Sequence, residues 1–177
     1  MIMAAIAVVL VAAGGWWWNK NQMVESRFFD HVRQGDGTLD RVKRHADHGT
    51  SGHLTPGEGI NYGATTPTSG RHDSRWVNPG IYESAQLPTL LVHSLEHGMV
   101  VIYHDRLEAD AMATLEDWSG LYAGPFNGIV VTRRAGLGEK VILTAWRKSL
   151  TQERFDAAPA AVFIDTYRGR GPENPVR

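Results

Sequence analysis

The stretch that most constrains the fold runs from Leu91 to Tyr103, because it combines a short helix, a stop signal and a buried strand. His93 and His97 are four residues apart, so in a helix their imidazoles lie on one face, one turn from each other. Gly98 then favours the left-handed conformation that ends a helix. The apolar, β-branched run that follows is typical of a buried strand. The sequence therefore predicts a helix that turns into a strand directly after the second histidine.

The same segment has the order His-x-x-Glu-His, with Glu96 before the second histidine. Inverted zinc peptidases use this order, with the glutamate as general base. Two imidazoles at this spacing can also bind a metal without hydrolysis, or cap carbonyls and pack in a polar core. A helix from about Pro88 to His97 is short for a zinc peptidase, and a third ligand must come from elsewhere. The spacing alone leaves these alternatives open.

Composition narrows the function classes. Lys and Arg total 18 against 19 for Asp and Glu, so the net charge is −1 and no basic field exists to attract nucleic acid. With 177 residues, 42% of them hydrophobic, the chain can form one ordinary domain plus an appendage. Cysteine is absent, which excludes disulfides, thiolate metal sites and cysteine nucleophiles. Any metal site must therefore use imidazole, carboxylate, methionine or tyrosine ligands.

The first 18 residues, 1–18, carry no charge and end in Trp16, Trp17 and Trp18. As a helix they would be about 27 Å long, enough for a thin bilayer, and tryptophan is typical of the headgroup level. A cleavable signal peptide is the alternative, but the charged leader is missing and bulky tryptophans replace the small residues at a cleavage site. We therefore expect a single transmembrane anchor that contacts the lipid bilayer, followed by a helical connector over residues 19–43.

The orientation of the anchor is not settled by charge. The few positive residues after the apolar run, Lys20, Arg27 and Arg33, would place the body of the protein in the cytoplasm under the positive-inside rule. Glu25 and Asp30 dilute this signal.

Residues 44–177 read as one α+β domain. Residues 44–80 form a long loop rich in His, Gly and Pro that includes His53 and His72, and a loop of this length is typically functional or disordered. Trp76, Trp118 and Trp146 are expected in the core. Besides the central helix and strand, we predict helices over residues 107–118 and 151–167 and strands over residues 129–132 and 140–146. Thr151 and Asp156 are the candidate N-caps of the last helix. Because helices and strands interleave without a strict β-α-β rhythm, we expect a small mixed domain with a few-stranded sheet.

Several motifs in this domain resemble one family. They are Pro67-Thr68-Ser69-Gly70-x-His72, Gly80-Ile81-Tyr82, His93-Ser94-Leu95-Glu96-His97-Gly98, Thr144-Ala145-Trp146 and the ending Tyr167-Arg168-Gly169-Arg170-Gly171-Pro172-Glu173. Over about residues 53–173 they resemble the bacterial membrane-anchored proteins of domain of unknown function family 3105. That family commonly has proline where this chain has Thr66 and Arg71. The resemblance implies an inner-membrane, single-pass protein with its domain on the periplasmic, extracytoplasmic side.

The resemblance also favours a metal site. His72, His93 and His97 fall on the family's histidine positions, and His53 matches a further, looser one. Two helical histidines and one aimed from a stiff Pro-Thr-Ser-Gly turn would form a three-imidazole set suited to Cu or Zn, with His53 as the fourth ligand. Glu96 would then accept a hydrogen bond from a ligand imidazole, or point away to Arg71 or Arg75. The alternative is that the histidines hydrogen-bond the long loop onto the sheet.

Three functions follow from these expectations. The first is an accessory, structural subunit of a larger integral-membrane complex, respiratory or photosynthetic, because the chain has no recognisable nucleophile, nucleotide loop or redox thiol. The second is a Cu- or Zn-binding, metal-delivery protein. The third and weakest is a metallohydrolase that uses Glu96 as base on a metal-bound water. We therefore expect a non-enzymatic role ahead of an enzymatic one.

Overall fold

The computed structural model describes the backbone of residues 2–47 and 52–177, with side chains from Trp18 onward within these ranges. The elements are α1 (Ile2–Gln34), η1 (Thr38–Arg41), β1 (Lys43–Arg44), β2 (Gly80–Tyr82), α2 (Pro88–Glu96), β3 (Val100–His104), α3 (Ala109–Leu121), β4 (Ile129–Arg133), β5 (Val141–Ala145), β6 (Lys148–Gln152) and α4 (Ala157–Tyr167). The predicted mixed α+β domain is confirmed.

The strands of the described chain form one mixed sheet of six strands in the order β1-β6-β5-β3-β4-β2. β3 lies inside the sheet, antiparallel to β5 and parallel to β4, with Ile102 opposite Leu143 on one side and Val131 on the other. β2 pairs with β4 in parallel, and β6 joins β5 to β1 in antiparallel pairs. The two edge strands are the shortest, as edge strands of natural sheets often are.

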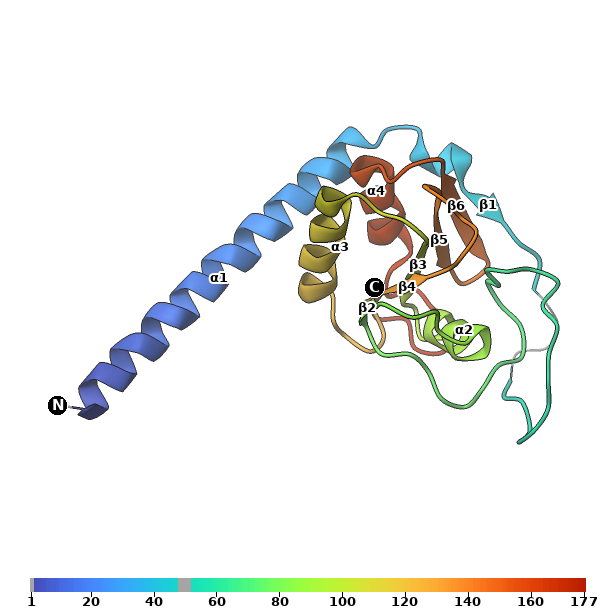
Figure 1. The fold of residues 1–177 in the computed structure, drawn as a ribbon, viewed down its shortest axis with the longest axis horizontal. Coiled ribbons are helices and arrows are strands. Elements are labelled where there is room, and N and C mark those ends of the chain that lie inside the picture. Colours follow the sequence, from blue (N-terminus) through green and yellow to red (C-terminus); the bar gives the residue numbers. More distant parts are fainter. Residues whose placement is uncertain (1, 48–51) are drawn as a thin grey trace.

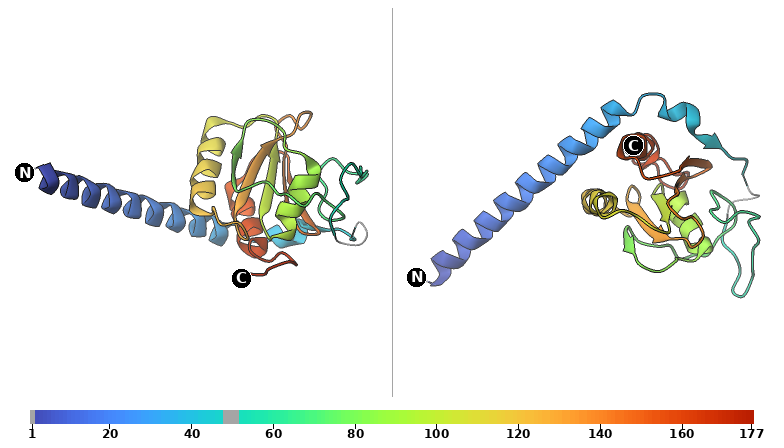
Figure 2. Two further views of the ribbon diagram at one scale, coloured as in Figure 1. Left: turned by 90° about the horizontal axis from the view of Figure 1, so that it is seen from below. Right: turned by 45° about the horizontal axis from the view of Figure 1, so that its top comes forward.

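Helices cover both faces of the sheet, so the domain has three layers. Alternate residues of β3 point to opposite faces. Val100 and Ile102 belong to the core cluster formed with α1, α3 and α4, whereas Val101 and Tyr103 pack in the cluster formed with α2. Figures 1 and 2 show α3 and α4 on one side of the sheet and α2 on the other, where residues 52–79 also run. A strand covered on both faces is apolar throughout, and all five residues of β3 are buried.

The predicted helix-to-strand corner is confirmed. Pro88 is at the first turn of α2, where its missing N–H costs nothing, and His97 is the C-cap residue. Gly98 follows with φ of 97°, a left-handed conformation that favours glycine. A Cβ at Gly98 would lie 2.7 Å from the backbone N of Gly171 and 2.9 Å from the carbonyl of Phe126, so the corner also requires glycine for close packing. The corner thereby fixes α2 against the end of the chain.

The N-terminal helix α1 divides into two parts. Its first half projects away from the domain (Figures 1 and 2), whereas its second half packs on it through Phe28, which is fully buried against Trp118 and Tyr122. Within the part of the chain that the structure describes, no helix is both long and apolar enough to span a membrane. Trp18 is 64% exposed, whereas Trp16 and Trp17 of the expected membrane interface lie outside the described side chains.

Residues 19–43, expected as a helical connector, are helical over most of their length. The helix α1 continues without a break through residue 18 and ends at Gln34, after which come Gly35, the short η1 and the strand β1. η1 follows Gly37, which has φ of 74°. The connector therefore turns back and enters the sheet at its β1 edge.

Three details of the sequence-based prediction are wrong. The helix expected over residues 151–167 begins only at Ala157, so its expected start at residue 151 is wrong. Of its two candidate N-caps, Asp156 is confirmed: its carboxylate accepts a hydrogen bond from the N–H of Ala158. The residues before it form β6, which was not predicted because its buried positions include the polar Ser149 and Gln152. Trp118 is in the core as expected, but Trp76 is 42% exposed. Trp146 is only partly buried against the α2-side cluster.

Candidate metal centre

The loop residues His53 and His72 are held side by side by backbone hydrogen bonds. The N–H of Leu54 donates to the carbonyl of His72 at 2.7 Å, and the N–H of His72 donates to the carbonyl of Gly52 at 3.1 Å. This forms an isolated parallel β-bridge between the two histidines. Since residues on paired extended segments lie opposite each other, the two rings come within 5.4 Å of each other, centroid to centroid.

A second part of the same loop is fixed directly on α2. The hydroxyl of Ser94 accepts from the N–H of Val77 at 3.0 Å and donates to the carbonyl of Val77 at 2.9 Å. On the preceding residue of α2, Nδ1 of His93 lies 2.8 Å from the carbonyl oxygen of Asp73. The polar residues of the predicted His-x-x-Glu-His helix therefore bind the loop to α2.

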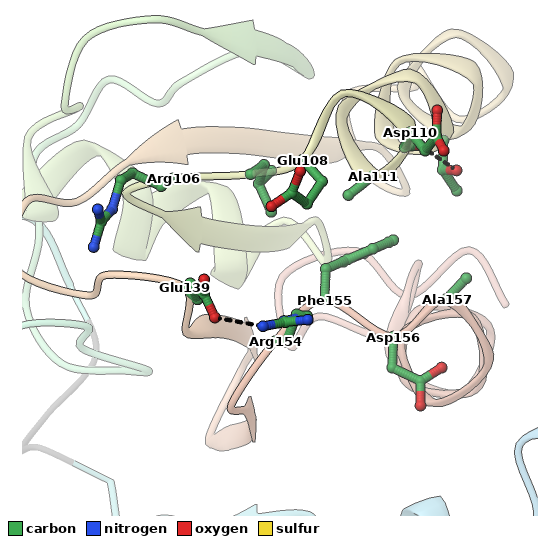
Figure 3. A pocket seen from close by; sticks show the side chains of 11 residues that line it. Arg106, Glu108, Asp110, Ala111, Glu139, Arg154, Phe155, Asp156 and Ala157 are labelled. Atoms are coloured by element: carbon green, nitrogen blue, oxygen red, sulfur yellow. Dashed lines mark hydrogen bonds and ion pairs between the residues drawn. The ribbon is translucent and has the colours of Figure 1, made fainter.

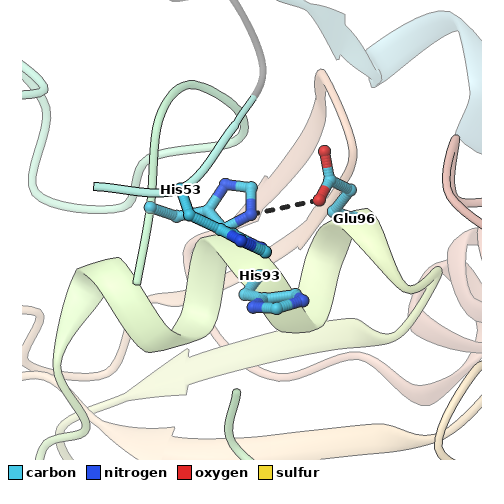
Figure 4. Close-up of side chains that lie close together, drawn as sticks. His53, His93 and Glu96 are labelled. Carbon is cyan, nitrogen blue, oxygen red and sulfur yellow. Dashed lines mark ion pairs between the residues drawn. The ribbon is translucent and has the colours of Figure 1, made fainter. Parts of the chain in front are cut away.

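These contacts bring four side chains together: His53, His72, His93 and Glu96. One donor atom from each lies within 4.8 Å of those from the other three. The ring of His93 is 5.0 Å from that of His53 and 4.8 Å from that of His72, centroid to centroid. Figure 4 shows the side chains of His53, His93 and Glu96 converging, the last two from α2. We call these four residues the inner set.

Backbone carbonyls fix the protonation pattern of two histidines in the inner set. Nδ1 of His72 lies 2.8 Å from the carbonyl oxygen of Gly70, and Nδ1 of His93 has the Asp73 carbonyl as partner. A carbonyl oxygen only accepts, so in both rings Nδ1 carries the hydrogen. In a neutral ring, Nε2 then carries a lone pair that is directed into the cluster. Ligand histidines in metal sites are usually oriented in this way.

The contact between His72 and Glu96 is the decisive feature. Nε2 of His72 lies 3.0 Å from Oε2 of Glu96, yet Nε2 is buried and has no hydrogen-bond partner among the described residues. His72 is fully buried and the Glu96 side chain is 14% exposed. With Nδ1 protonated, a neutral His72 directs a lone pair toward a carboxylate oxygen, and two acceptors repel each other. A proton on either group, or a metal ion between the two atoms, removes this repulsion.

His97 lies in a second group of donors, with His93 and Glu173. Their donor atoms also lie within 4.8 Å of one another. Nε2 of His97 is 2.9 Å from Oε2 of Glu173, and Nδ1 of His97 is 3.3 Å from the carbonyl oxygen of Pro125. We call His93, His97 and Glu173 the outer set, because the Glu173 side chain is 46% exposed. His93 belongs to both sets.

The family model with the description Protein of unknown function (DUF3105) matches residues 53–177. The chain belongs to this family. The match confirms the resemblance seen in the sequence, and it begins at His53 and includes every residue of the inner and outer sets. No curated protein and no solved structure matches the chain.

The DUF3105 domain thus places the four predicted histidines in two overlapping groups. The structure brings His53, His72 and His93 together, whereas His97 faces Glu173 instead. Of the two alternatives for Glu96, the structure has the contact with an imidazole: Arg71 pairs with Glu58 and Arg75 pairs with Asp73. Glu173 was not predicted as a site residue. Its only signal in the sequence is its place in the Gly171-Pro172-Glu173 ending of the family.

Burial lowers the pKa of His93 below its ordinary value, and the neighbouring histidines His72, His97 and His53 add to this effect. The carbonyl of Asp73 acts in the opposite direction. A lowered pKa keeps an imidazole neutral, which is the form that binds metal ions.

A separate cavity of about 780 Å³ lies between the start of α3 and the loop from β6 to α4. Its lining includes Leu107. Figure 3 shows Asp110, Phe155 and the ion pair between Glu139 and Arg154 in the same lining. None of its lining residues belongs to the inner or outer set. The cavity and the histidine cluster are therefore two separate places in the described structure.

Proposed function

We propose that this DUF3105 protein binds a divalent transition metal ion, Zn²⁺ or Cu²⁺, and serves in metal binding and delivery. The ligands are one ring nitrogen of His53, Nε2 of His72 and His93, and the carboxylate of Glu96. The observation that carries the proposal is the pair of facing acceptors, Nε2 of His72 and Oε2 of Glu96, 3.0 Å apart in a buried place. A divalent ion between them removes the repulsion and uses both lone pairs.

The donor chemistry suits these metals. Imidazole and carboxylate are common ligands of Zn²⁺ and Cu²⁺, and the chain has no cysteine that would select a softer ion. Ligands about 2.0–2.1 Å from a tetrahedral ion lie about 3.3 Å from one another. The donors of the inner set are up to 4.8 Å apart, so binding requires a small contraction. His53 has an exposed side chain and can move with little cost in packing.

Binding and delivery fit this geometry better than hydrolysis does. A hydrolase of the His-x-x-Glu-His type keeps its glutamate free to take a proton from a metal-bound water. Glu96 instead lies against the ring nitrogen of His72, as a ligand would. In addition, α2 has only nine residues. We therefore infer that the ion is held and passed on rather than used for hydrolysis.

The test is metal analysis of the full-length chain, purified gently and also reloaded with Zn²⁺ or Cu²⁺. We expect close to one ion per chain in the wild type, as in a four-ligand site. His93→Ala should abolish binding, and His53→Ala should weaken it without disturbing the core because this side chain is exposed. His31→Ala, on α1 and outside both sets, is the matched control and should bind like the wild type. A wild type that binds neither ion after reloading overturns the proposal.

We also propose, as a second function, that the protein is a membrane-attached accessory subunit of a larger integral-membrane complex, of respiratory or photosynthetic type. The supporting observation is that the first half of α1 extends beyond the domain (Figure 1) and that residues 1–18 carry no charged side chain. This helix would attach the domain to the inner membrane, with the domain on the periplasmic side.

Membrane fractionation and native purification test this second proposal. We expect the full-length chain in the membrane fraction together with stoichiometric partner subunits, and a variant that lacks residues 2–18 in the soluble fraction. Accessibility of the domain to a protease added to intact spheroplasts tests its side of the membrane. A full-length chain that is soluble and migrates alone in native gels would exclude attachment and assembly.

A further inference from the structure

The outer set, His93, His97 and Glu173, is a three-donor group on the exposed side of the inner set. Nε2 of His93 is 3.9 Å and Nε2 of His97 is 2.9 Å from Oε2 of Glu173. His93 and His97 are each 3% exposed, whereas the Glu173 side chain is 46% exposed. One end of this set is therefore buried next to the inner set, and the other end is open to solvent.

His93 can serve only one of the two sets at a time. Its Nδ1 carries the hydrogen bonded to the Asp73 carbonyl, so Nε2 is its single free donor atom. Nε2 must complete the inner set or the outer set, since an imidazole lone pair binds one ion. Two ions cannot both have full coordination here, but one ion can exchange its other ligands while it stays bound to His93.

The outer set has a rigid part and a part carried by the end of the chain. The ring of His97 packs against the rings of Trp76 and Phe126, with centroid distances of 4.6 and 4.5 Å. Glu173 belongs to the C-terminal segment, and its own backbone N–H donates to the carbonyl of Glu96 at 3.3 Å. The exposed carboxylate can therefore swing while the imidazole stays fixed.

We propose that the outer set is the transfer position through which the metal ion enters and leaves the inner set. The inner set supplies four donors and fills a tetrahedral ion, whereas the outer set supplies three and leaves one coordination position for a ligand of the donor or acceptor molecule. In the transfer step the bonds to His53, His72 and Glu96 break, bonds to His97 and Glu173 form, and the bond to His93 is kept. The charge of the ion does not change. This inference rests on the proposed metal binding.

The test is the kinetics of Zn²⁺ uptake and release by the full-length chain, measured by stopped flow with a chromophoric chelator. Glu173→Gln removes the charge of the outer carboxylate at an exposed place and preserves its shape. We expect both the association and the dissociation rate constants to fall by about tenfold, the kinetic equivalent of one lost charged contact. The Kd should stay within about twofold of the wild type, because the inner set is intact.

Controls separate this inference from the proposed function. Glu116→Gln, an exposed carboxylate on α3, should leave both rate constants unchanged. His97→Ala should reproduce the slow exchange of Glu173→Gln if the variant folds. A wild type that binds neither Zn²⁺ nor Cu²⁺ contradicts the proposed function itself. Normal binding with wild-type exchange rates in Glu173→Gln overturns the transfer position alone, and so does tight binding of two ions per chain.

Discussion

Nε2 of His72 and Oε2 of Glu96 lie 3.0 Å apart, and each is an acceptor when the ring is neutral. Because the carbonyl of Gly70 holds the ring hydrogen on Nδ1, the ring cannot relieve the contact by moving that hydrogen to Nε2. With the ring neutral and the carboxyl ionised the contact is unfavourable, and a cation bound between the two atoms would make it favourable. Any measurement that responds to a cation in this place therefore tests the proposed metal binding.

The first prediction concerns stabilisation by zinc. Free Zn²⁺ at about 100 times its Kd should raise the free energy of unfolding by about 2.7 kcal/mol. For a chain of this size this corresponds to a rise in Tm of about 5–10 °C, measured by thermal denaturation with and without a chelator. In His72→Gln the rise should disappear. The shift is taken within each variant, so a general loss of stability does not affect it.

The control for this prediction is His31→Ala, which should show the wild-type shift because His31 is in neither set. An equal zinc-induced shift in His72→Gln would mean that the ion binds without the inner set.

The second prediction is a pH dependence caused by the loop that carries His53. Arg71 pairs with Glu58 and also donates through Nη2 to the carbonyl of His53 at 3.2 Å. The hydrogen bond from Arg71, with further bonds from Thr55, lowers the pKa of Glu58 from 4.5 to about 2. A carboxyl whose pKa is lower in the folded than in the unfolded chain stabilises the folded state at pH values above the unfolded pKa. This contribution is lost as the pH falls from about 4.5 to about 2.

Thermal denaturation of the wild type and Glu58→Gln between pH 3 and pH 7 measures this effect. The wild type should have the higher Tm by a constant margin above about pH 5, and the margin should shrink as the pH falls below that value. A margin that stays constant down to pH 3 would contradict the lowered pKa. Glu116→Gln is the control, because it replaces an exposed carboxylate on the outer side of α3.

The parts of the fold that could be predicted are those encoded by neighbouring residues. Pro88 and Gly98 mark the two ends of α2, and the apolar run after Gly98 is β3. The strand β6 was not predicted because its sequence pattern is not apolar. Its polar residues Ser149 and Gln152 are buried through tertiary contacts. Gln152, for example, donates to the carbonyl of Asp156 and accepts from its N–H.

The candidate site could be predicted only in part for the same reason. The spacing of His93 and His97 on a helix is a local signal, but which donors join them depends on how distant segments pack. Glu173 reaches His97 because Gly171 fits against Gly98, where a Cβ on Gly171 would lie 2.3 Å from the backbone N of Gly98. Trp76 was expected in the core, yet it lies partly exposed over the ring of His97.

The third prediction tests whether the second half of α1 is part of the domain core. Phe28 is fully buried and makes edge-to-face contacts with Trp118 and Tyr122 at centroid distances of 5.3 and 5.1 Å. Phe28→Ala should therefore lower the free energy of unfolding by about 3–5 kcal/mol, measured by denaturant titration. Met23→Ala, on the same helix but 47% exposed, should change it by less than about 0.5 kcal/mol. Equal effects of the two substitutions would mean that α1 does not pack as described.

The last prediction concerns the corner at Gly98. Ala at this position would have to adopt φ of 97°, which costs about 1–3 kcal/mol, and its Cβ would lie within 2.9 Å of backbone atoms of Gly171 and Phe126. Backbone cannot rotate away as a side chain can, so we expect Gly98→Ala to displace the C-terminal segment as well as to lower stability. The matched control is Gly120→Ala on α3, where nothing lies within 4 Å and the change should be neutral or stabilising by up to about 1 kcal/mol.

Denaturant titration measures the stability of both glycine variants, and Zn²⁺ exchange measures the placement of Glu173. Because Glu173 is carried by the displaced segment, Gly98→Ala should slow Zn²⁺ release and uptake in the same way as Glu173→Gln, whereas Gly120→Ala should exchange Zn²⁺ at the wild-type rate. A Gly98→Ala variant that is destabilised but exchanges zinc normally would show that the corner sets stability alone, and that the outer carboxylate reaches His97 without support from Gly98.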